Sequence, residues 1–200
     1  MSLLVETIKI LDGEIFNIDY HSSRFNKTRK ELFNTGPAVD LSTKIIIPAY
    51  VRNGLFKCRI EYDDHIRKID FHPYKIKRIR TLKLVEAGDL DYSYKFINRS
   101  GINTLLEQKN GCDDILMVKD GMITDTSYAN IIVRGNDRIW YTPSSFIIRG
   151  TKREYLLNQG LIREKIITPA SLKRFRELRM INSMLDIDDT DSIPVRTICF

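Results

Sequence analysis

Four short turn sequences, each between two apolar runs, constrain the fold of this chain more than any other feature. Asp12-Gly13 follows "LLVETIKI", and Asp63-Asp64-His65 separates "LFKCRIEY" from "IRKIDF". "KDG" follows "DILMV", and "RGND" lies between "ANIIV" and "RIWYTP". Tight turns between such segments are the strongest local signal of a β-hairpin. The sequence therefore predicts four hairpins and a largely antiparallel sheet structure.

Helix signals occur between these hairpins. Asp19 can cap a helix that runs through Phe33, and Asp40 can cap a second helix over residues 41–53. Pro48 lies inside that second segment, where a proline usually kinks a helix. Three further helices are predicted over residues 100–111, 151–159 and 169–177, and a closing strand over residues 192–200.

Hairpins mixed with helices indicate an α+β fold class. The periodicity is lost near residues 86–91, so we place a domain boundary there. The expected organisation is an N-terminal α/β domain over residues 1–88 and a strand-rich, cofactor-binding C-terminal domain over residues 89–200.

The composition is that of an ordinary globular protein, with 42% hydrophobic and 29% charged residues. No apolar run approaches the roughly 20 residues that span a bilayer, and the N-terminus lacks the basic start of a secretory signal. The three cysteines are odd in number and widely spaced, so we expect them to stay reduced. These features favour a cytoplasmic protein with no membrane partner.

The net charge of +6 favours acidic partners without identifying them. The densest basic segment, residues 75–83, alternates isoleucine or leucine with lysine and arginine. A strand with one solvated face explains that pattern best. An RNA-binding groove is the alternative, but it would need aromatic residues between the basic ones for base stacking.

A polar insert lies between "DILMV" and "IIV" and contains an acid, hydroxyls and an amide. It could be an Asx-type turn whose side chains satisfy backbone groups at a sheet corner. It could instead fix a carboxylate between strands, opposite a buried cation. The insert alone favours the turn. Its polar residues are Thr124, Asp125, Thr126, Ser127 and Asn130.

Three other segments contain residues suited to a charged ligand. Lys95 lies among aromatic and aliphatic neighbours in "YKFINRS", where burial would favour a neutral, nucleophilic amine. A lone lysine on a half-buried strand, however, more often extends to solvent. Gly150 precedes a predicted helix whose free N–H groups could hold a phosphate. A predicted strand ends at Asn182 and Ser183.

In this order and spacing, the segments resemble the class IV aminotransferases. This family, of the branched-chain and D-amino-acid aminotransferase type, uses pyridoxal 5′-phosphate (PLP). The resemblance covers nearly the whole chain, from "LLVETIKILDGEIF" through "HSSRF" to "ELRMINSML". It is most specific in the combination of "YKFINR", "GMITDTSYANIIV", "WYTP" and "RGTKR". It implies the two-domain D-amino-acid aminotransferase-like fold (PLP fold type IV) and a homodimer.

The resemblance also implies roles for individual residues. Lys95 matches the lysine that binds the cofactor covalently, and Asp125 matches the acid that faces the pyridine nitrogen. Asn130 matches an asparagine that helps to hold this arrangement, and Arg24, in "HSSRF", matches an arginine that binds the phosphate. The other matches to phosphate-contacting segments are Gly150, Thr151, Lys152, Asn182 and Ser183.

The implied chemistry gives the acid in the insert a function. PLP accepts electrons from the substrate Cα best when its ring nitrogen carries a proton, which a nearby carboxylate retains. The implied role of Lys95 is to hold the cofactor and then to move protons as general base and acid.

The sequence departs from the family pattern at three places. Asp125 stands where glutamate is general, and Lys152 stands where a small hydroxyl residue is common. Members also carry a segment before the first strand that walls the substrate pocket, whereas Met1 is only five residues before Glu6. We therefore expect a more open pocket or a wall from another chain.

Within the family, the short chain is most similar to the lyase branch. That branch converts 4-amino-4-deoxychorismate, a small amino-acid-like substrate, to 4-aminobenzoate and pyruvate. An aminotransferase acting on a branched-chain or D-amino acid is the alternative. A binding protein without catalysis, either an RNA-binding protein or a family member that only retains PLP, is the alternative of another class. We expect no nucleic acid partner and no metal.

Overall fold

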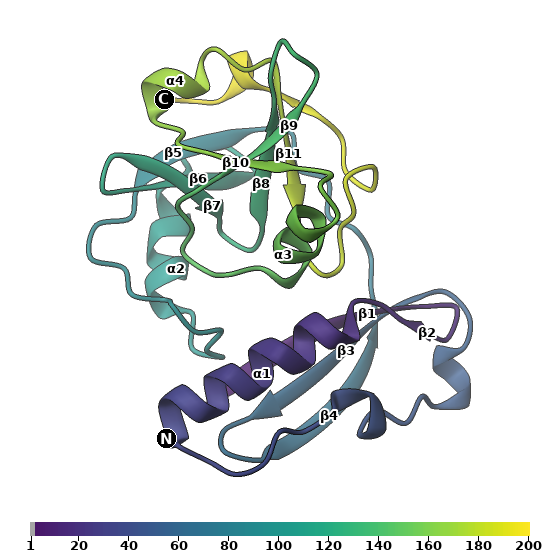
Figure 1. Cartoon of the computed structure of the whole chain (residues 1–200). Helices are drawn as coiled ribbons and strands as arrows, with labels where there is room; N and C mark the ends of the chain where they lie inside the picture. Colours follow the sequence, from purple (N-terminus) through teal and green to yellow (C-terminus); the bar gives the residue numbers. More distant parts are fainter. Residues whose placement is uncertain (1–2) are drawn as a thin grey trace. The chain divides into compact units, whose positions relative to one another are not determined.

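The structure is a computed structural model that describes residues 3–200 (Figure 1). Residue contacts divide the chain into two compact units. The first contains the residues up to Lys75 together with Tyr94–Asn98, and the second contains Ile76–Ser93 and Arg99–Phe200. Residues 76–88, assigned to the first domain from the sequence, thus cluster with the second unit.

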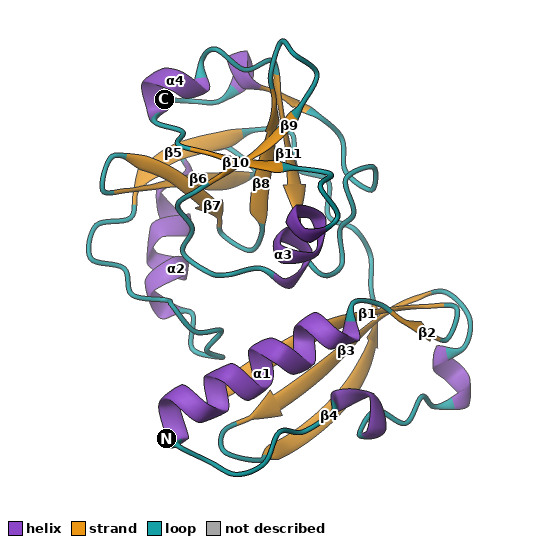
Figure 2. Ribbon diagram, viewed as in Figure 1, coloured by secondary structure: helices purple, strands orange, loops and turns teal. Residues whose placement is uncertain are grey.

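The first unit is a four-stranded antiparallel sheet with one long helix across a face (Figure 2). Its strand order is β2-β1-β3-β4. Asp12 and Gly13 both have positive φ, 50° and 83°, as the tight turn between β1 and β2 requires. Both hairpins predicted for this unit are confirmed. The strands are β1 (Leu4–Leu11), β2 (Glu14–Ile15), β3 (Leu55–Tyr62) and β4 (Ile66–Pro73).

Helix α1 (Ile18–Phe33) confirms the first predicted helix, but Asp19 does not cap it. The N-cap is Asn17 in the left-handed conformation, and Asp19 lies in the first turn, where its charge favours the helix dipole. Phe25 packs against Tyr62 in the sheet with ring centroids 4.4 Å apart. The buried face of α1 is partly polar, and this polar part bears on the site described below. Its buried residues are His21, Phe25, Thr28 and Arg29.

The helix predicted over residues 41–53 is wrong. The segment forms two short 3₁₀ turns, η1 (Leu41–Thr43) and η2 (Ala49–Val51). The Asp40 cap is confirmed, since its Oδ1 accepts a hydrogen bond from Ser42 N at 2.9 Å. Three consecutive isoleucines and then Pro48, which has no N–H, prevent a longer helix.

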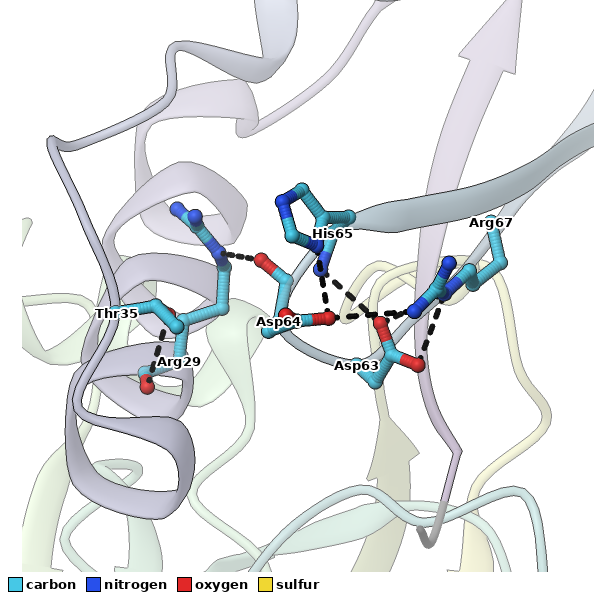
Figure 3. A network of polar contacts seen from close by, with 6 residues as sticks. All are labelled: Arg29, Thr35, Asp63, Asp64, His65 and Arg67. Carbon is cyan, nitrogen blue, oxygen red and sulfur yellow. Dashed lines mark hydrogen bonds and ion pairs between the residues drawn. The ribbon is translucent and has the colours of Figure 1, made fainter.

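The turn between β3 and β4 is tied to α1 by polar contacts (Figure 3). Asp63 Oδ1 accepts hydrogen bonds from His65 N at 3.1 Å and from Arg67 Nε at 2.8 Å. Arg29 Nε of α1 donates to the carbonyl of Asp64 at 2.8 Å. The Asp63 contacts order the turn itself, and the Arg29 contact ties the C-terminal half of α1 to it.

The second unit contains two sheets. The three-stranded sheet has the order β5-β6-β7, and the five-stranded sheet has the order β10-β9-β8-β11-β12. Its strands are β5 (Leu82–Glu86), β6 (Asp114–Lys119), β7 (Met122–Thr126), β8 (Asn130–Arg134), β9 (Trp140–Pro143), β10 (Arg163–Lys165), β11 (Glu177–Ile181) and β12 (Ile193–Pro194). Its helices are α2 (Ser100–Leu106), η3 (Glu107–Lys109), α3 (Thr151–Asn158), α4 (Pro169–Leu172) and η4 (Val195–Thr197).

The core of this unit explains why its apolar runs are continuous. Leu116 in β6, Ile131 in β8 and Leu178 in β11 are fully buried in one hydrophobic cluster. Strands covered on both faces need apolar residues at successive positions rather than at alternate ones. The two hairpins predicted here, β6–β7 and β8–β9, are confirmed.

Several other predictions for the second unit need correction. Residues 75–81 are not a strand, and β5 begins only at Leu82. The helix expected over residues 169–177 ends after four residues, and the closing strand is reduced to Ile193–Pro194. Helix α3 forms as predicted, whereas α2 begins at Ser100 as predicted but ends at Leu106 and is followed by the 3₁₀ helix η3. No helix within residues 3–200 is both long and apolar enough to cross a membrane.

Candidate active site

A buried cluster of charged and polar side chains lies between β1 and α1 in the first unit. Glu6 is in β1, and His21 and Arg24 are one turn apart on α1. Arg24 binds the Glu6 carboxylate through two nitrogens, with Nε 2.8 Å from Oε1 and Nη2 2.6 Å from Oε2. His21 Nδ1 lies 2.6 Å from Glu6 Oε2. Arg24 is thus held in a fixed orientation on the helix.

The charges in this cluster set its protonation states. Burial of Glu6 opposes ionisation, but the charge of Arg24 and hydrogen bonds from His21 and Arg24 outweigh it and lower the pKa to about 2. Burial lowers the pKa of His21, against the effect of Glu6. Glu6 is therefore an anion at neutral pH and His21 is a neutral imidazole.

Lys95 belongs to the same unit. Its segment lies along β1, where Val5 N donates to Lys95 O at 2.9 Å and Phe96 forms an antiparallel bridge with Leu4. The Lys95 side chain is half-buried, and its charge is among those that lower the pKa of His21. The structure therefore brings Lys95 and Arg24, two of the predicted site residues, into one electrostatic neighbourhood around His21.

Asp125, the acid of the polar insert, is at the end of β7 in the second unit and is 4% exposed. Its Oδ2 accepts hydrogen bonds from Ile147 N at 2.8 Å and Ile148 N at 2.9 Å, and its Oδ1 accepts one from Asn130 Nδ2 at 2.7 Å. The local turn of the insert is made by Thr126 instead, whose Oγ1 is 3.2 Å from Ala129 N. The Asx-type turn interpretation of Asp125 is therefore wrong, since its backbone donors are distant in sequence.

The pKa of Asp125 is raised to about 6. Burial is the largest cause, and the hydrogen bonds from Ile148, Asn130 and Ile147, together with the charge of Arg153, offset it only in part. The three donors that bind the carboxylate are all electrically neutral, and they occupy three of its roughly four lone-pair directions. The carboxylate would accept a further, cationic donor.

Gly150 brings the start of α3 against Asn130, the side chain that binds this acid. A Cβ at Gly150 would lie 1.8 Å from Asn130 Oδ1, so only glycine permits this approach of the backbone. Asn130 also donates through Nδ2 to Ile148 O at 3.1 Å. Thr151 begins α3 and is 3% exposed. Asp125, Asn130 and the N-terminus of α3 thus form one connected arrangement.

The remaining predicted residues lie on the turn after β11 and on α3. Asn182 Oδ1 accepts from Met184 N at 2.8 Å, and Asn182 Nδ2 donates to Tyr128 O at 3.3 Å. Ser183, the next residue in the sequence, is buried. Lys152 Nζ forms an ion pair with Asp186, and this ion pair connects α3 to the turn after β11. The Lys152 ammonium is therefore already neutralised within the chain.

Sequence reasoning missed Glu6 and His21 as site residues, and it missed the peptide N–H groups of Ile147 and Ile148. Glu6 carried a usable signal, because an acid in the apolar strand "LLVETIKI" needs a cationic partner when buried. The two peptide N–H groups carried none, since every residue except proline has one.

The residues of each unit fit the parts of a phosphorylated pyridine aldehyde. The first unit offers an amine and a guanidinium, at Lys95 and Arg24. The second offers a buried carboxylate whose hydrogen-bond donors among residues 3–200 are neutral, and the N-terminus of α3, a kind of site suited to a phosphate. This set of groups is typical of enzymes that bind PLP through a lysine.

Comparisons with known proteins agree with this class. The family model described as "Amino-transferase class IV" matches residues 3–193. An uncharacterized protein of Haemophilus influenzae is 37% identical over 183 residues, which are 90% of this chain and 97% of that protein.

Solved structures give the same result. One from Haemophilus somnus 129PT, described as a "putative 4-amino-4-deoxychorismate lyase", has a TM-score of 0.86 and 36% identity over 92% of this chain and 97% of its own. A fold IV transaminase of Curtobacterium pusillum has a TM-score of 0.73 at 16% identity, over 98% of this chain and 82% of its own.

The fold is that of the fold type IV transaminases, which confirms the predicted mixed helix-and-sheet class. The chain belongs to the class IV aminotransferase family, whose members are PLP-dependent enzymes.

Proposed function

We propose that this protein is a PLP-dependent lyase that converts 4-amino-4-deoxychorismate into 4-aminobenzoate and pyruvate. The observation that carries the proposal is the 36% identity, over nearly the full length of both chains, to the Haemophilus somnus protein described in those terms. The proposal includes PLP as cofactor and a homodimer, as the resemblance implies, and a cytoplasmic location, as the composition and cysteine usage lead us to expect.

Lys95 would hold the cofactor and act as the proton-transferring base and acid at the substrate. Its placement supports this role, because Lys95 is half-buried near neutral His21 and the cation of Arg24.

Arg24 would bind the phosphate from the first unit. Glu6 fixes the orientation of the guanidinium through Nε and Nη2, and this cation would pair with the phosphate. Gly150, Thr151 and Lys152 would contribute backbone N–H groups at the start of α3. The last contacts would come from Asn182 and Ser183.

Asp125 would keep a proton on the ring nitrogen, with Asn130 holding the carboxylate. When bound, PLP supplies an electron sink for the substrate Cα. Asp125 is suited to this role because it is buried and the described residues that donate hydrogen bonds to it are all neutral. A pyridinium would provide that donor.

The test is to incubate the purified protein with PLP and 4-amino-4-deoxychorismate and to measure 4-aminobenzoate and pyruvate. We expect both products in equal amounts and a yellow protein that borohydride bleaches. Lys95→Ala should lower the rate by roughly 10²–10⁴-fold, as expected for a lost general base. Asp125→Asn should still bind PLP but lose about 10²-fold in turnover.

Parallel reactions with pairs of amino acids and keto acids test the alternative. Amino-group transfer without 4-aminobenzoate would establish an aminotransferase. A wild-type protein that stays colourless with added PLP would contradict the cofactor assignment itself.

A further inference from the structure

Two cysteines that are distant in the sequence meet in the second unit. The Sγ atoms of Cys112 and Cys199 are 3.4 Å apart, although 87 positions separate the residues in the sequence. Both are free thiols. Cys112 is buried at 8% exposure, and Cys199 is exposed. The wide spacing of the cysteines in the sequence therefore gave no sign that two of the thiols lie close together in the structure.

The backbone holds the two cysteines on either side of the start of β5. On one edge, Cys199 N donates to Leu82 O at 2.9 Å, and Leu84 N donates to Cys199 O at 2.8 Å. On the other edge β6 begins, and Asp114 pairs with Leu82. Cys112 is two residues before Asp114, so the thiols approach each other around the end of the strand.

The loop that contains Cys112 is also fixed to the residues just before β5. Asp113 N donates to the carbonyl of Thr81 at 3.2 Å, and Asp113 Oδ2 accepts from Thr81 N at 3.0 Å and Arg80 N at 2.7 Å. Both thiols are thus carried by backbone that hydrogen bonds hold in place. Ordering of this kind gives an intramolecular reaction a high effective concentration.

The two thiols differ in reactivity. Cys199 is exposed and is available to a small oxidant. Burial raises the pKa of Cys112, and its contact with the Cys199 thiol raises it further. Cys112 therefore stays protonated at neutral pH and is suited to react second.

We propose that Cys112 and Cys199 are an oxidation site at which a hydroperoxide converts the two thiols into an intramolecular disulfide. The Cys199 thiolate attacks a peroxide oxygen, the O–O bond breaks, and a sulfenic acid forms with release of water or an alcohol. Cys112 then loses its proton and attacks the Cys199 sulfur. The S–S bond forms as the S–O bond breaks and water leaves. The two thiols supply the two electrons and two protons that reduce the peroxide.

The disulfide would link the C-terminal residues covalently to the loop before β6, in the sheet that contains Asp125. In the thiol state this tail is held by backbone hydrogen bonds to β5, by buried Ile198 and by the bond from Lys83 Nζ to Phe200 O at 2.8 Å. A covalent link between residues so distant in sequence removes much of the freedom of the opened state. Oxidation would therefore suppress local opening of the tail.

The experiment compares the reduced full-length protein before and after treatment with hydrogen peroxide. Peptide mass spectrometry without reductant should find the Cys112–Cys199 cross-link, with the loss of two hydrogens. Hydrogen exchange at the Leu84 and Cys199 amides should slow by about 10-fold or more, because the tail opens less often. Dithiothreitol should reverse both changes.

Three serine variants give matched controls. Cys58→Ser should form the cross-link as the wild type does, since burial raises the pKa of Cys58 to about 12 and it lies in the other unit. Cys112→Ser should instead accumulate a sulfenic acid at Cys199 that dimedone traps. Oxidation of the wild type to a sulfinic acid at Cys199, or to disulfides between chains, without the Cys112–Cys199 link would overturn the proposal.

Discussion

Glu6 in the first unit and Asp125 in the second are both almost completely buried, and their pKa values move in opposite directions. The pKa of Glu6 falls to about 2, whereas that of Asp125 rises to about 6. Both groups accept several hydrogen bonds, so the number of donors does not explain the difference. Glu6 is bound by a guanidinium, while the donors to Asp125 are two peptide groups and an amide.

This comparison separates two uses of a buried acid. Neutral donors orient a carboxylate but do not balance its charge, so burial continues to disfavour ionisation. The charge of Glu6 is compensated inside the chain, which makes it a fixed support for Arg24. The charge of Asp125 is oriented but poorly compensated, and an added cation would stabilise it. The comparison therefore supports the role proposed for Asp125.

The largest effect is expected from Glu6→Gln. This change leaves Arg24, which is 15% exposed, and buried His21 without their anion, and such losses cost about 3–5 kcal/mol. Urea unfolding would measure the free energy of unfolding. Glu31→Gln is the control, because the Lys27–Glu31 pair is exposed at 3.9 Å and should contribute no more than about 0.5 kcal/mol. A similar small loss in both variants would show that Glu6 is not compensated as described.

The pH dependence of stability should run in opposite directions for the two acids. Glu6 has a folded pKa of about 2, below its ordinary 4.5, so it adds stability above pH 4.5 that is lost as the pH falls toward 2. Asp125 has a folded pKa of about 6, above its ordinary 3.8, so stability is lost as the pH rises from 3.8 to 6. Each change amounts to about 3 kcal/mol at ~1.4 kcal/mol per pKa unit.

These changes are measured without PLP as differences in unfolding free energy between the wild type and Glu6→Gln or Asp125→Asn. The advantage of the wild type over Glu6→Gln should grow with pH, and that over Asp125→Asn should shrink. If the difference in unfolding free energy changed with pH in the same way for both pairs, the opposite pKa shifts of Glu6 and Asp125 would be contradicted. Saturating PLP should flatten the slope for Asp125 if the ring nitrogen supplies the missing cation.

A smaller effect is expected from Gly150→Ala. The new methyl group would lie 1.8 Å from Asn130 Oδ1, and overpacking of this kind costs about 1–3 kcal/mol. The same substitution in an Asn130→Ala background should cost less, because the clashing amide is gone. Additive losses in a double-mutant cycle would show that Gly150 and Asn130 do not make the contact described.

Local chemistry made much of the fold predictable. Asp12-Gly13 and Asp120-Gly121 fix their turns with residues that tolerate positive φ, and the hairpins form where these pairs stand. The helix expected over residues 41–53 failed because a good cap at Asp40 cannot compensate for Pro48. Local sequence preferences therefore predicted the structure correctly where neighbouring residues alone decide the backbone conformation.

The candidate site was predictable only in part, since its contacts are long-range. Asp125 could be selected from its sequence context, but its donors Ile147 and Ile148 follow 22 and 23 residues later. Arg24 was selected as a phosphate ligand, yet the Glu6 that orients it lies 18 residues earlier. No periodicity or turn signal records such pairings, because they depend on how the strands and helices pack.

The return of Tyr94–Asn98 to the first unit has a consequence for fragmentation of the protein. The chain passes between the units three times, after Lys75, Ser93 and Asn98. A cut at residue 88 would therefore release an N-terminal piece that lacks the segment alongside Leu4 and Val5, and with it Lys95. We therefore expect neither fragment to fold stably by itself. Two fragments mixed together would have to pair residues 94–98 with β1 again before the first unit could form.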